Sequence, residues 1–227
     1  MGSFCVSSLT YSTVPSPSVA LETVYLETID GITIEADVLR TDAALVRGTV
    51  IIGHPHPLYG GDRHNHVVQA MQRAAYEMDC HSIAPDFRGT GMSGGQHDDG
   101  DAERLDLMAA CELADMMEPD GAIVMCGYSF GSVVAMNVTH PYIVGWIAMA
   151  PPLPMLTSAP LASRYAQPKI LLAPEHDQFT DPSKLQEHIA QWTATTVTVM
   201  PQVDHSIAVG AEQFFKSALD EILSPVR

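Results

Sequence analysis

The residues with the clearest chemical potential are those from Gly127 to Gly131, which read Gly-Tyr-Ser-Phe-Gly. The apolar run 122–126 before them favours a buried strand, and the run 132–138 after them favours a packed helix. A serine on so sharp a strand-to-helix turn presents its hydroxyl beside a helix N-terminus, and flanking glycines tolerate the tight backbone. A plain glycine-bounded turn has the same pattern. Nucleophilic chemistry by Ser129 therefore requires a base, an acid and an oxyanion site elsewhere in the chain.

Candidates for the base and the acid lie downstream of the serine. A serine hydroxyl is a poor nucleophile unless a base accepts its proton, and that base needs an acidic partner to orient it. In parallel-sheet proteins with this turn, the acid and the histidine follow the serine in that order. Asp177 and His205 follow Ser129 in this order, each just beyond a predicted strand. Glu175 is an alternative acid, but we favour Asp177 because it precedes a loop that enters a helix capped by Asp181.

An oxyanion site can be formed by two backbone N–H groups. The negative charge that develops on a carbonyl oxygen needs donors that are already in place. One should be the N–H of Phe130, which follows the serine, and the other should come from loop 54–61. This loop reads His-Pro-His-Pro-Leu-Tyr-Gly-Gly, and its two prolines have no N–H. We favour His56 as the second donor, with Leu58 as the alternative.

Histidines are concentrated in and after this loop, so a metal site also has to be considered. They are His54, His56, His64 and His66. Their spacing does not form an H-E-x-x-H pattern, and Asp62 is the obvious carboxylate near them. Hydrogen-bonded structural histidines fit this pattern better, and we expect neither a metal ion nor another cofactor.

A second glycine-rich segment, Asp86 to Gly94, reads Asp-Phe-Arg-Gly-Thr-Gly-Met-Ser-Gly. Its glycines are compatible with a phosphate-binding loop, but the G-x-x-x-x-G-K pattern is absent. We therefore expect a structural loop that is braced by an ion pair between Asp86 and Arg88.

The elements that position these residues alternate along the chain. Strands are expected at 22–28, 32–39, 49–53, 81–85, 122–126, 143–149, 169–173 and 195–200, and helices at 67–78, 101–117, 130–139, 182–192 and 209–223. This order predicts an α/β fold with a mostly parallel central sheet, helices on both faces and an N-terminal antiparallel hairpin. Residues 1–20 are expected to form a flexible arm, and residues 21–227 a single domain without a lid.

The composition restricts the partners and the compartment. The 227 residues are 46% hydrophobic and carry a formal net charge of −16, which is typical of a globular protein that repels nucleic acid and anionic membranes. We expect no bilayer-spanning run and no secretory signal. The four cysteines lack paired spacing, and Cys111 and Cys126 are expected to be buried thiols, which favours a reducing, cytoplasmic location. The sequence is compatible with a homo-oligomer.

Together these segments resemble the α/β-hydrolase superfamily, and most closely its small, lidless, dienelactone-hydrolase-like group, which is marked by an HPHPxxGG loop. The resemblance rests on loop 54–61, on the run from Asp86 to Gly94, on the pentapeptide, and on the acid and the base. It extends from about residue 22 to the C-terminus.

The resemblance implies a role for each candidate. Ser129 would be the nucleophile, His205 the general base and Asp177 its orienting partner. There is one departure from the family pattern, because relatives often carry aromatic residues and another histidine after the base, whereas this chain has Ser206-Ile207-Ala208. The departure leaves the triad intact but changes one wall of the pocket.

A chain without a lid should have an open pocket beside the serine. Its walls are expected to include Leu58, Tyr59, Phe130, Pro152, Leu153 and Met155. Our hypothesis is a serine hydrolase that cleaves carboxylic esters, thioesters or lactones of a small-molecule acyl substrate through an acyl-enzyme. One alternative uses the same triad for acyl transfer, cyclisation or lyase chemistry in a biosynthetic pathway, which product analysis would distinguish. The other is a non-catalytic ligand-binding protein, which covalent labelling of Ser129 would exclude.

Overall fold

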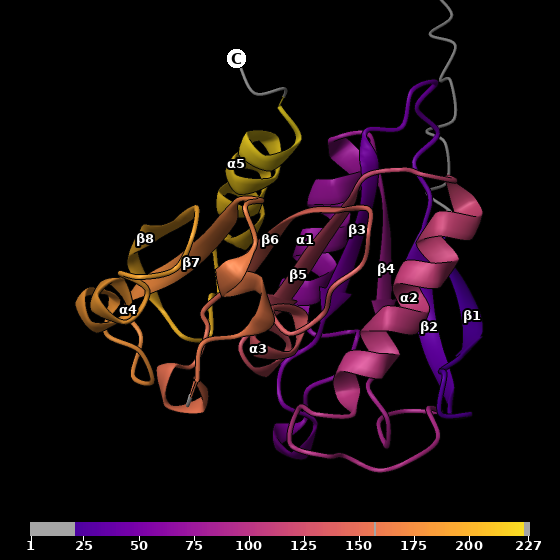
Figure 1. The fold of residues 1–227 in the computed structure, drawn as a ribbon, viewed down its shortest axis with the longest axis horizontal. Coiled ribbons are helices and arrows are strands. Elements are labelled where there is room, and N and C mark those ends of the chain that lie inside the picture. Colours follow the sequence, from indigo (N-terminus) through magenta and orange to yellow (C-terminus); the bar gives the residue numbers. More distant parts are fainter. Residues whose placement is uncertain (1–20, 157, 225–227) are drawn as a thin grey trace, which may run out of the picture.

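A single sheet organises the chain in this computed structural model, which describes residues 21–156 and 158–224 (Figure 1). The strand order is β1-β2-β4-β3-β5-β6-β7-β8. The bounds are β1 Leu21–Glu27, β2 Thr33–Leu39, β3 Gly48–Gly53, β4 Cys80–Pro85, β5 Ile123–Tyr128, β6 Ile143–Met149, β7 Lys169–His176 and β8 Thr195–Asp204. β1 and β2 form an antiparallel hairpin, β2 pairs antiparallel with β4, and the remaining pairs are parallel. The predicted arm, residues 1–20, lies outside the described residues.

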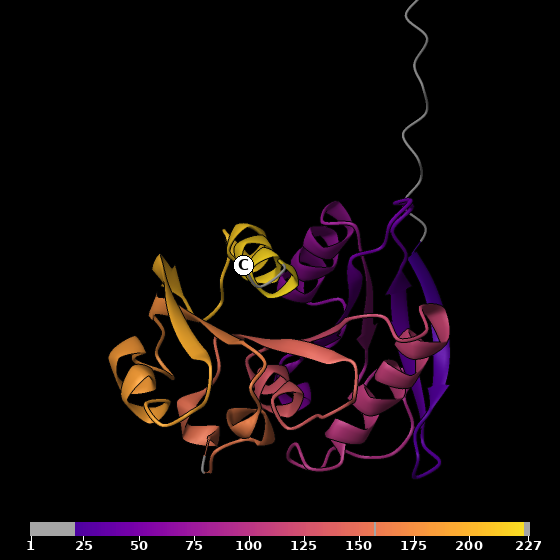
Figure 2. The same cartoon turned by 45° about the horizontal axis from the view of Figure 1, so that its top comes forward.

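Helices cover both faces of this sheet, which confirms the predicted α/β-hydrolase architecture. α1 (His66–Glu77) and α5 (Ala211–Leu223) lie side by side on one face, as Figure 2 shows. The other face carries α2 (Glu103–Met117), α3 (Phe130–Ala135) and α4 (Pro182–His188). None of the helices in the described ranges combines the length and the apolar character needed to cross a bilayer.

No helical lid covers the strand ends in the described residues. Beyond five α-helices, the described residues form three short 3₁₀ turns, η1 Pro57–Tyr59, η2 Leu153–Met155 and η3 Leu161–Arg164. The segment between β6 and β7, where η2 and η3 lie, is short and rich in proline.

The two central strands, β3 and β5, are buried along their whole length. Because successive side chains of a strand point to opposite faces, Met125 of β5 packs toward α2 and α3, whereas Val124 and Cys126 pack toward α1 and α5. Cys80, Cys111 and Cys126 are buried free thiols, as predicted for the last two. The unbroken apolar runs of these strands are thus explained by a core on both sides.

The N-terminus of α3 lies directly on β3. A Cβ atom added at Gly131 would lie 2.3 Å from the backbone carbonyl group of Gly53, and one added at Gly127 would lie 2.2 Å from the carbonyl oxygen of Gly131. Real Cβ atoms do not approach backbone atoms this closely, so both pentapeptide glycines are required by close packing as well as by the turn.

The last two strands of the sheet, β7 and the edge strand β8, continue past their predicted ends at residues 173 and 200. They remain paired as far as His176 and Asp204, after an irregularity at Pro174, which has no N–H to donate. Because of this extension, the residues that follow the two strands, Asp177 and His205, lie close together at the ends of the strands.

α3 is shorter than the predicted helix 130–139. After Ala135 the helical carbonyl of Met136 accepts a hydrogen bond from the N–H of Ala162 at 2.9 Å. The side chain of Asn137 donates back to the carbonyl of Val133 and accepts from the N–H of Leu161. The segment after β6 therefore takes over the hydrogen bonds that a longer helix would make.

The predicted ion pair between Asp86 and Arg88 is wrong. Asp86 accepts hydrogen bonds from the backbone N–H and the guanidinium of Arg63. Arg88 binds Asp106, with Nη2 2.8 Å from Oδ1, and also Asp30 of the β1–β2 turn, with Nη1 2.8 Å from Oδ2. Asp86 and Arg88, two residues apart in one loop, thus bind different parts of the chain. Together these contacts fix the loop at more points than an ion pair between the two residues would.

Candidate active site

Ser129 occupies the tight turn between β5 and α3. Its backbone has φ 53° and ψ −121°, a conformation that is rare for a residue other than glycine. The turn is fixed by a hydrogen bond from its N–H to the carbonyl of Met149 at 2.9 Å, and by one from the Ser132 hydroxyl to its carbonyl at 2.5 Å. The strained backbone is therefore held from both β6 and α3.

Three side chains form a continuous hydrogen-bonded line. Ser129 Oγ lies 2.9 Å from His205 Nε2, and His205 Nδ1 lies 2.8 Å from Asp177 Oδ2. The Asp177 side chain is fully buried and that of His205 is 12% exposed. Because an ionised carboxylate can only accept, Nδ1 carries the imidazole proton and Nε2 is free to accept from the serine hydroxyl. The three residues that the sequence selects are brought together.

The Asp177 carboxylate is oriented by its own loop. Its Oδ1 accepts hydrogen bonds from the N–H of Phe179 at 2.7 Å and of Thr180 at 3.2 Å. The Thr180 hydroxyl in turn donates to the carbonyl of Pro151 at 2.8 Å. The alternative acid, Glu175, accepts from the N–H of Gln202 and stabilises the bend of β8. Of the two candidates, Asp177 is therefore the residue that contacts the histidine.

Tyr128 is a further site residue that sequence reasoning did not select. Its hydroxyl donates to the backbone carbonyl of His205 at 2.7 Å. Burial raises the pKa of Tyr128 to about 12, so that the hydroxyl keeps its proton at neutral pH. The residue before Ser129 thus fixes the loop that carries the histidine. The signal available in the sequence was a hydroxyl-bearing aromatic at the second position of the pentapeptide.

The loop after β3 offers one free N–H near the serine. The N–H of Leu58 donates to His56 Nδ1 at 3.3 Å, while those of Tyr59 and Gly61 donate to the His56 carbonyl. Burial and the neighbouring His97 lower the pKa of His56, which favours the neutral ring that can accept in this way. Within the described residues nothing accepts the N–H of His56, which leaves it available where the alternative, Leu58, is engaged.

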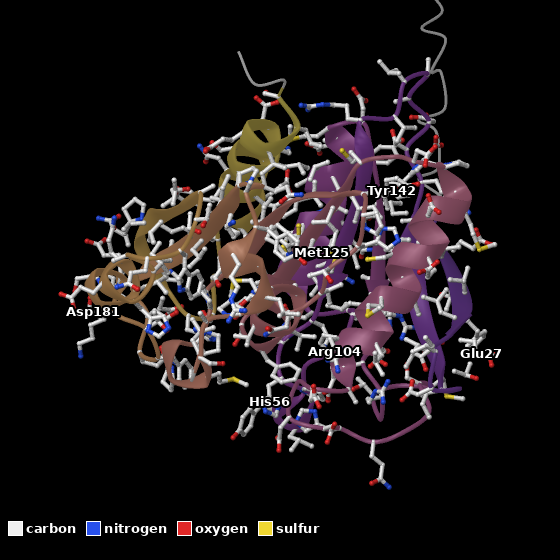
Figure 3. All side chains as sticks on the ribbon, viewed as in Figure 1. Glu27, His56, Arg104, Met125, Tyr142 and Asp181 are labelled. Carbon is white, nitrogen blue, oxygen red and sulfur yellow. The ribbon has the colours of Figure 1, made fainter. Side chains whose placement is uncertain are left out.

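The Phe130 ring contacts the His56 ring, with centroids 4.8 Å apart, so the two predicted donor residues are neighbours. The N–H of Phe130 is the first of α3 and therefore has no acceptor within the helix. In Figure 3 the labelled His56 lies at the lower edge of the molecule, the edge at which Figure 1 shows β5 leading into α3.

The histidines of the metal interpretation have separate polar partners. His54 is buried, with Nε2 accepting from the N–H of Phe87 at 2.9 Å and Nδ1 2.6 Å from the carbonyl of Pro55. His66 Nε2 lies 3.0 Å from the carbonyl of Ser206, and His64 Nδ1 lies 3.6 Å from Asp37. Across the described residues, no three His, Cys, Asp or Glu side chains are grouped to hold a metal ion.

Comparison with known proteins identifies the family of this fold. The sequence model of the alpha/beta hydrolase family matches residues 45–225. The chain belongs to the alpha/beta hydrolase family. A curated relative, an uncharacterized protein of Rickettsia prowazekii, is 25% identical over 182 residues, which are 75% of this chain and 73% of that protein.

Solved structures of other family members are similar along nearly their whole length. XC6422 of Xanthomonas campestris, described as a serine hydrolase without a lid, is 25% identical with a TM-score of 0.77, covering 92% of this chain and 95% of that one. A serine hydrolase homologue from Coxiella burnetii is also 25% identical, with a TM-score of 0.74 and coverage of 89% and 95%. The relatives support a hydrolase role for this chain.

A hollow of about 280 Å³ opens beside Ser129 in this alpha/beta hydrolase. Half of its lining consists of rings, namely His56, Tyr59, Tyr128, Phe179 and His205. The Phe179 ring meets His205 edge-on, with centroids 4.6 Å apart. Phe179 was not among the predicted wall residues, and it comes from the same loop that orients the acid.

The predicted wall residues are distributed over several places. Tyr59 lines the hollow that contains Ser129, whereas Leu58 lines a second hollow beside it. Met155 lines a separate hollow near Val133, and Pro152 is buried. The side chain of Leu153 lies outside the described part of the structure.

The buried His54 generates a prediction about acid stability. Burial lowers its pKa to about 4, whereas an unfolded histidine titrates near about 6.5. The unfolded chain therefore binds the extra proton between these values. The contribution of His54 to the free energy of unfolding should have its full value above about pH 6.5. It should fall by about 1.4 kcal/mol per pH unit between about pH 6.5 and about pH 4.

The measurement is urea unfolding at several pH values for the wild type and His54→Gln. The glutamine amide can accept the Phe87 N–H but does not titrate, so the variant should be less stable at pH 7 and lose less stability on acidification. Parallel pH profiles for the two proteins would contradict the role assigned to His54.

Proposed function

We propose that this protein is a serine hydrolase that cleaves carboxylic esters through an acyl-enzyme. The observation that carries the proposal is the line from Ser129 through His205 to Asp177, with both contacts at hydrogen-bond distance and the acid buried. The family membership and the lidless serine hydrolase from Xanthomonas campestris, with its high structural similarity, support it. Thioesters and lactones present the same electrophilic carbonyl carbon and fall within the proposal.

In the first step, Ser129 Oγ attacks the carbonyl carbon while His205 Nε2 accepts the hydroxyl proton. The electron pair of the carbonyl double bond moves to its oxygen, which receives hydrogen bonds from the N–H groups of His56 and Phe130. Asp177 holds the imidazole in the tautomer that can accept at Nε2, and stabilises the imidazolium that forms.

In the second step, the tetrahedral intermediate collapses and the bond to the leaving alcohol breaks. His205 gives its proton to the leaving oxygen, and the acyl group stays on Ser129. Water then attacks the acyl-enzyme as His205 accepts one of its protons, and collapse of this second intermediate returns that proton to Ser129. The products are a carboxylic acid and an alcohol, and every proton is accounted for by the one histidine.

Replacing the nucleophile tests this proposal directly. Ser129→Ala should leave the fold intact and lower kcat/KM for 4-nitrophenyl acetate by at least about 10³-fold, because no covalent intermediate can form. Ser217→Ala, at an exposed position on α5, is the matched control and should retain wild-type activity. Comparable rates in Ser129→Ala and the control would exclude the serine mechanism.

The oxyanion donor in the loop can be tested through the backbone. His56 has φ −56°, close to the value that proline imposes, so His56→Pro removes the N–H with little change in conformation. His56→Ala removes the imidazole but keeps the N–H. We expect kcat/KM of the proline variant to be about 10²-fold below that of the alanine variant, with similar urea midpoints. Equal values of kcat/KM would exclude His56 as a donor.

A further inference from the structure

Among the described residues, the lining of the hollow that contains Ser129 includes no Asp, Glu, Lys or Arg side chain. Apart from its rings and the serine, the described residues around it are two glycines, a proline and Asn65. Asn65 is already engaged, because its side chain accepts from the N–H of Val67 at the start of α1. A charged substrate group in this hollow would lose water without gaining a counter-ion, which is costly.

A second hollow of about 550 Å³ adjoins the first across Gly60 and Gly61, which line both. Gly60 has no side chain, and a Cβ atom added there would meet nothing within 4 Å, so the space beside this shared residue is open. A substrate whose ester group lies at Ser129 can therefore extend into the second hollow. Together the two spaces have the size of a small-molecule site.

Among the described residues that line the second hollow, Arg63 is the only lysine or arginine. Its positive charge is already neutralised by carboxylates. Arg63 Nη1 lies 2.8 Å from Glu35 Oε2, and Nε lies 3.1 Å from Asp37 Oδ1. The same guanidinium also binds Asp86, and its side chain is only 8% exposed. Three buried carboxylates thus surround one arginine, and none of its charge is left for a ligand.

Apart from Arg63, the Asp, Glu, Lys and Arg side chains among the described lining residues of the two hollows are all carboxylates. Asp62 lines the second hollow, and the exposed Asp99 lies 3.3 Å from His97, which also lines it. The whole chain carries a formal charge of −16. At low salt, where the Debye length is about 30 Å at 0.01 M, these charges act together on a ligand that enters the site.

From this arrangement we infer that the site selects uncharged esters and rejects esters that carry an anionic group, which includes half-esters of dicarboxylic acids and acyl thioesters of phosphate-bearing carriers. The inference rests on the proposed ester hydrolysis and narrows its substrate class. The ring-lined hollow takes the part next to the carbonyl. A longer substituent crosses Gly60 and Gly61 into the acidic second hollow, where an anion has no partner.

Three matched substrates test the inference. They are 4-nitrophenyl hexanoate, the 4-nitrophenyl half-ester of adipic acid, and 4-nitrophenyl 6-(trimethylammonio)hexanoate, which share the leaving group and differ in the charge at the far end of the acyl chain. In 0.01 M salt we expect kcat/KM of the anionic ester to be at least about 30-fold below that of the neutral ester. The cationic ester should lose less than about fivefold, and about 0.5 M salt should reduce the discrimination against the anion.

A designed cation should reverse part of the discrimination. Tyr59 lines the hollow and is 88% exposed, so a lysine there can place its charge beside the acyl chain at little cost in packing. Tyr59→Lys should lower the neutral-to-anionic ratio of kcat/KM at least about fivefold. Tyr59→Gln removes the same ring without adding charge, and should leave that ratio within about twofold of the wild type.

A binding measurement separates this inference from the proposed reaction. Calorimetry with Ser129→Ala compares ethyl hexanoate with monoethyl adipate, neither of which that variant should turn over. Weaker binding of monoethyl adipate than of ethyl hexanoate supports charge selection, whatever the kinetics show. If the wild type hydrolyses none of the three 4-nitrophenyl esters, the proposed reaction is overturned but charge selection is not. Equal kcat/KM and equal binding for neutral and anionic compounds would overturn charge selection. The proposed ester hydrolysis would still stand in that case if hydrolysis depends on Ser129.

Discussion

The backbone of Gly131 lies against the backbone of Gly53, and neither residue leaves room for a side chain between α3 and β3. This contact brings the N-terminus of α3 onto the central strands, so the chain must reverse direction within one residue after β5. Ser129 takes up that reversal in a strained conformation that bonds to Met149 and Ser132 hold in place. The loop after β3, which carries the His56 N–H, is positioned by the same contact.

The acid and the base reach Ser129 from the edge of the sheet by a different route. β7 and β8 stay paired up to His176 and Asp204, so Asp177 and His205 leave the last ladder position together. Tyr128, the neighbour of Ser129, then donates to the carbonyl of His205. His205 is thus bound by two consecutive residues, Tyr128 at the end of β5 through the His205 carbonyl, and Ser129 directly after β5 through the imidazole.

Much of this arrangement follows from local sequence patterns. Unbroken apolar runs identified the buried strands, and the order of serine, acid and histidine selected side chains that do meet. The ends of β7 and β8 were missed because Pro174 and the polar residues after it interrupt the apolar pattern, although pairing resumes beyond them. The partners of Asp86 and Arg88 were missed for another reason. They come from elements distant in sequence, and nothing in a local pattern shows which buried carboxylate an arginine will reach.

The pocket was the least predictable part of the site. Phe179 lines it because the loop that orients Asp177 also turns this ring toward His205. Leu58 and Tyr59 are adjacent in the chain but line different hollows, since η1 points successive side chains in different directions. Such placements depend on the path of a loop, which residue type alone does not determine.

The central claim is that His205 and Asp177 make Ser129 a nucleophile. The most direct measurement is the rate at which a fluorophosphonate probe labels the intact protein, followed by mass spectrometry of the modified peptide. We expect one adduct, on Ser129, with a labelling rate that falls at least about 10²-fold in His205→Gln and is also lowered in Asp177→Asn. An adduct on another residue, or equal labelling rates in all three proteins, would contradict it.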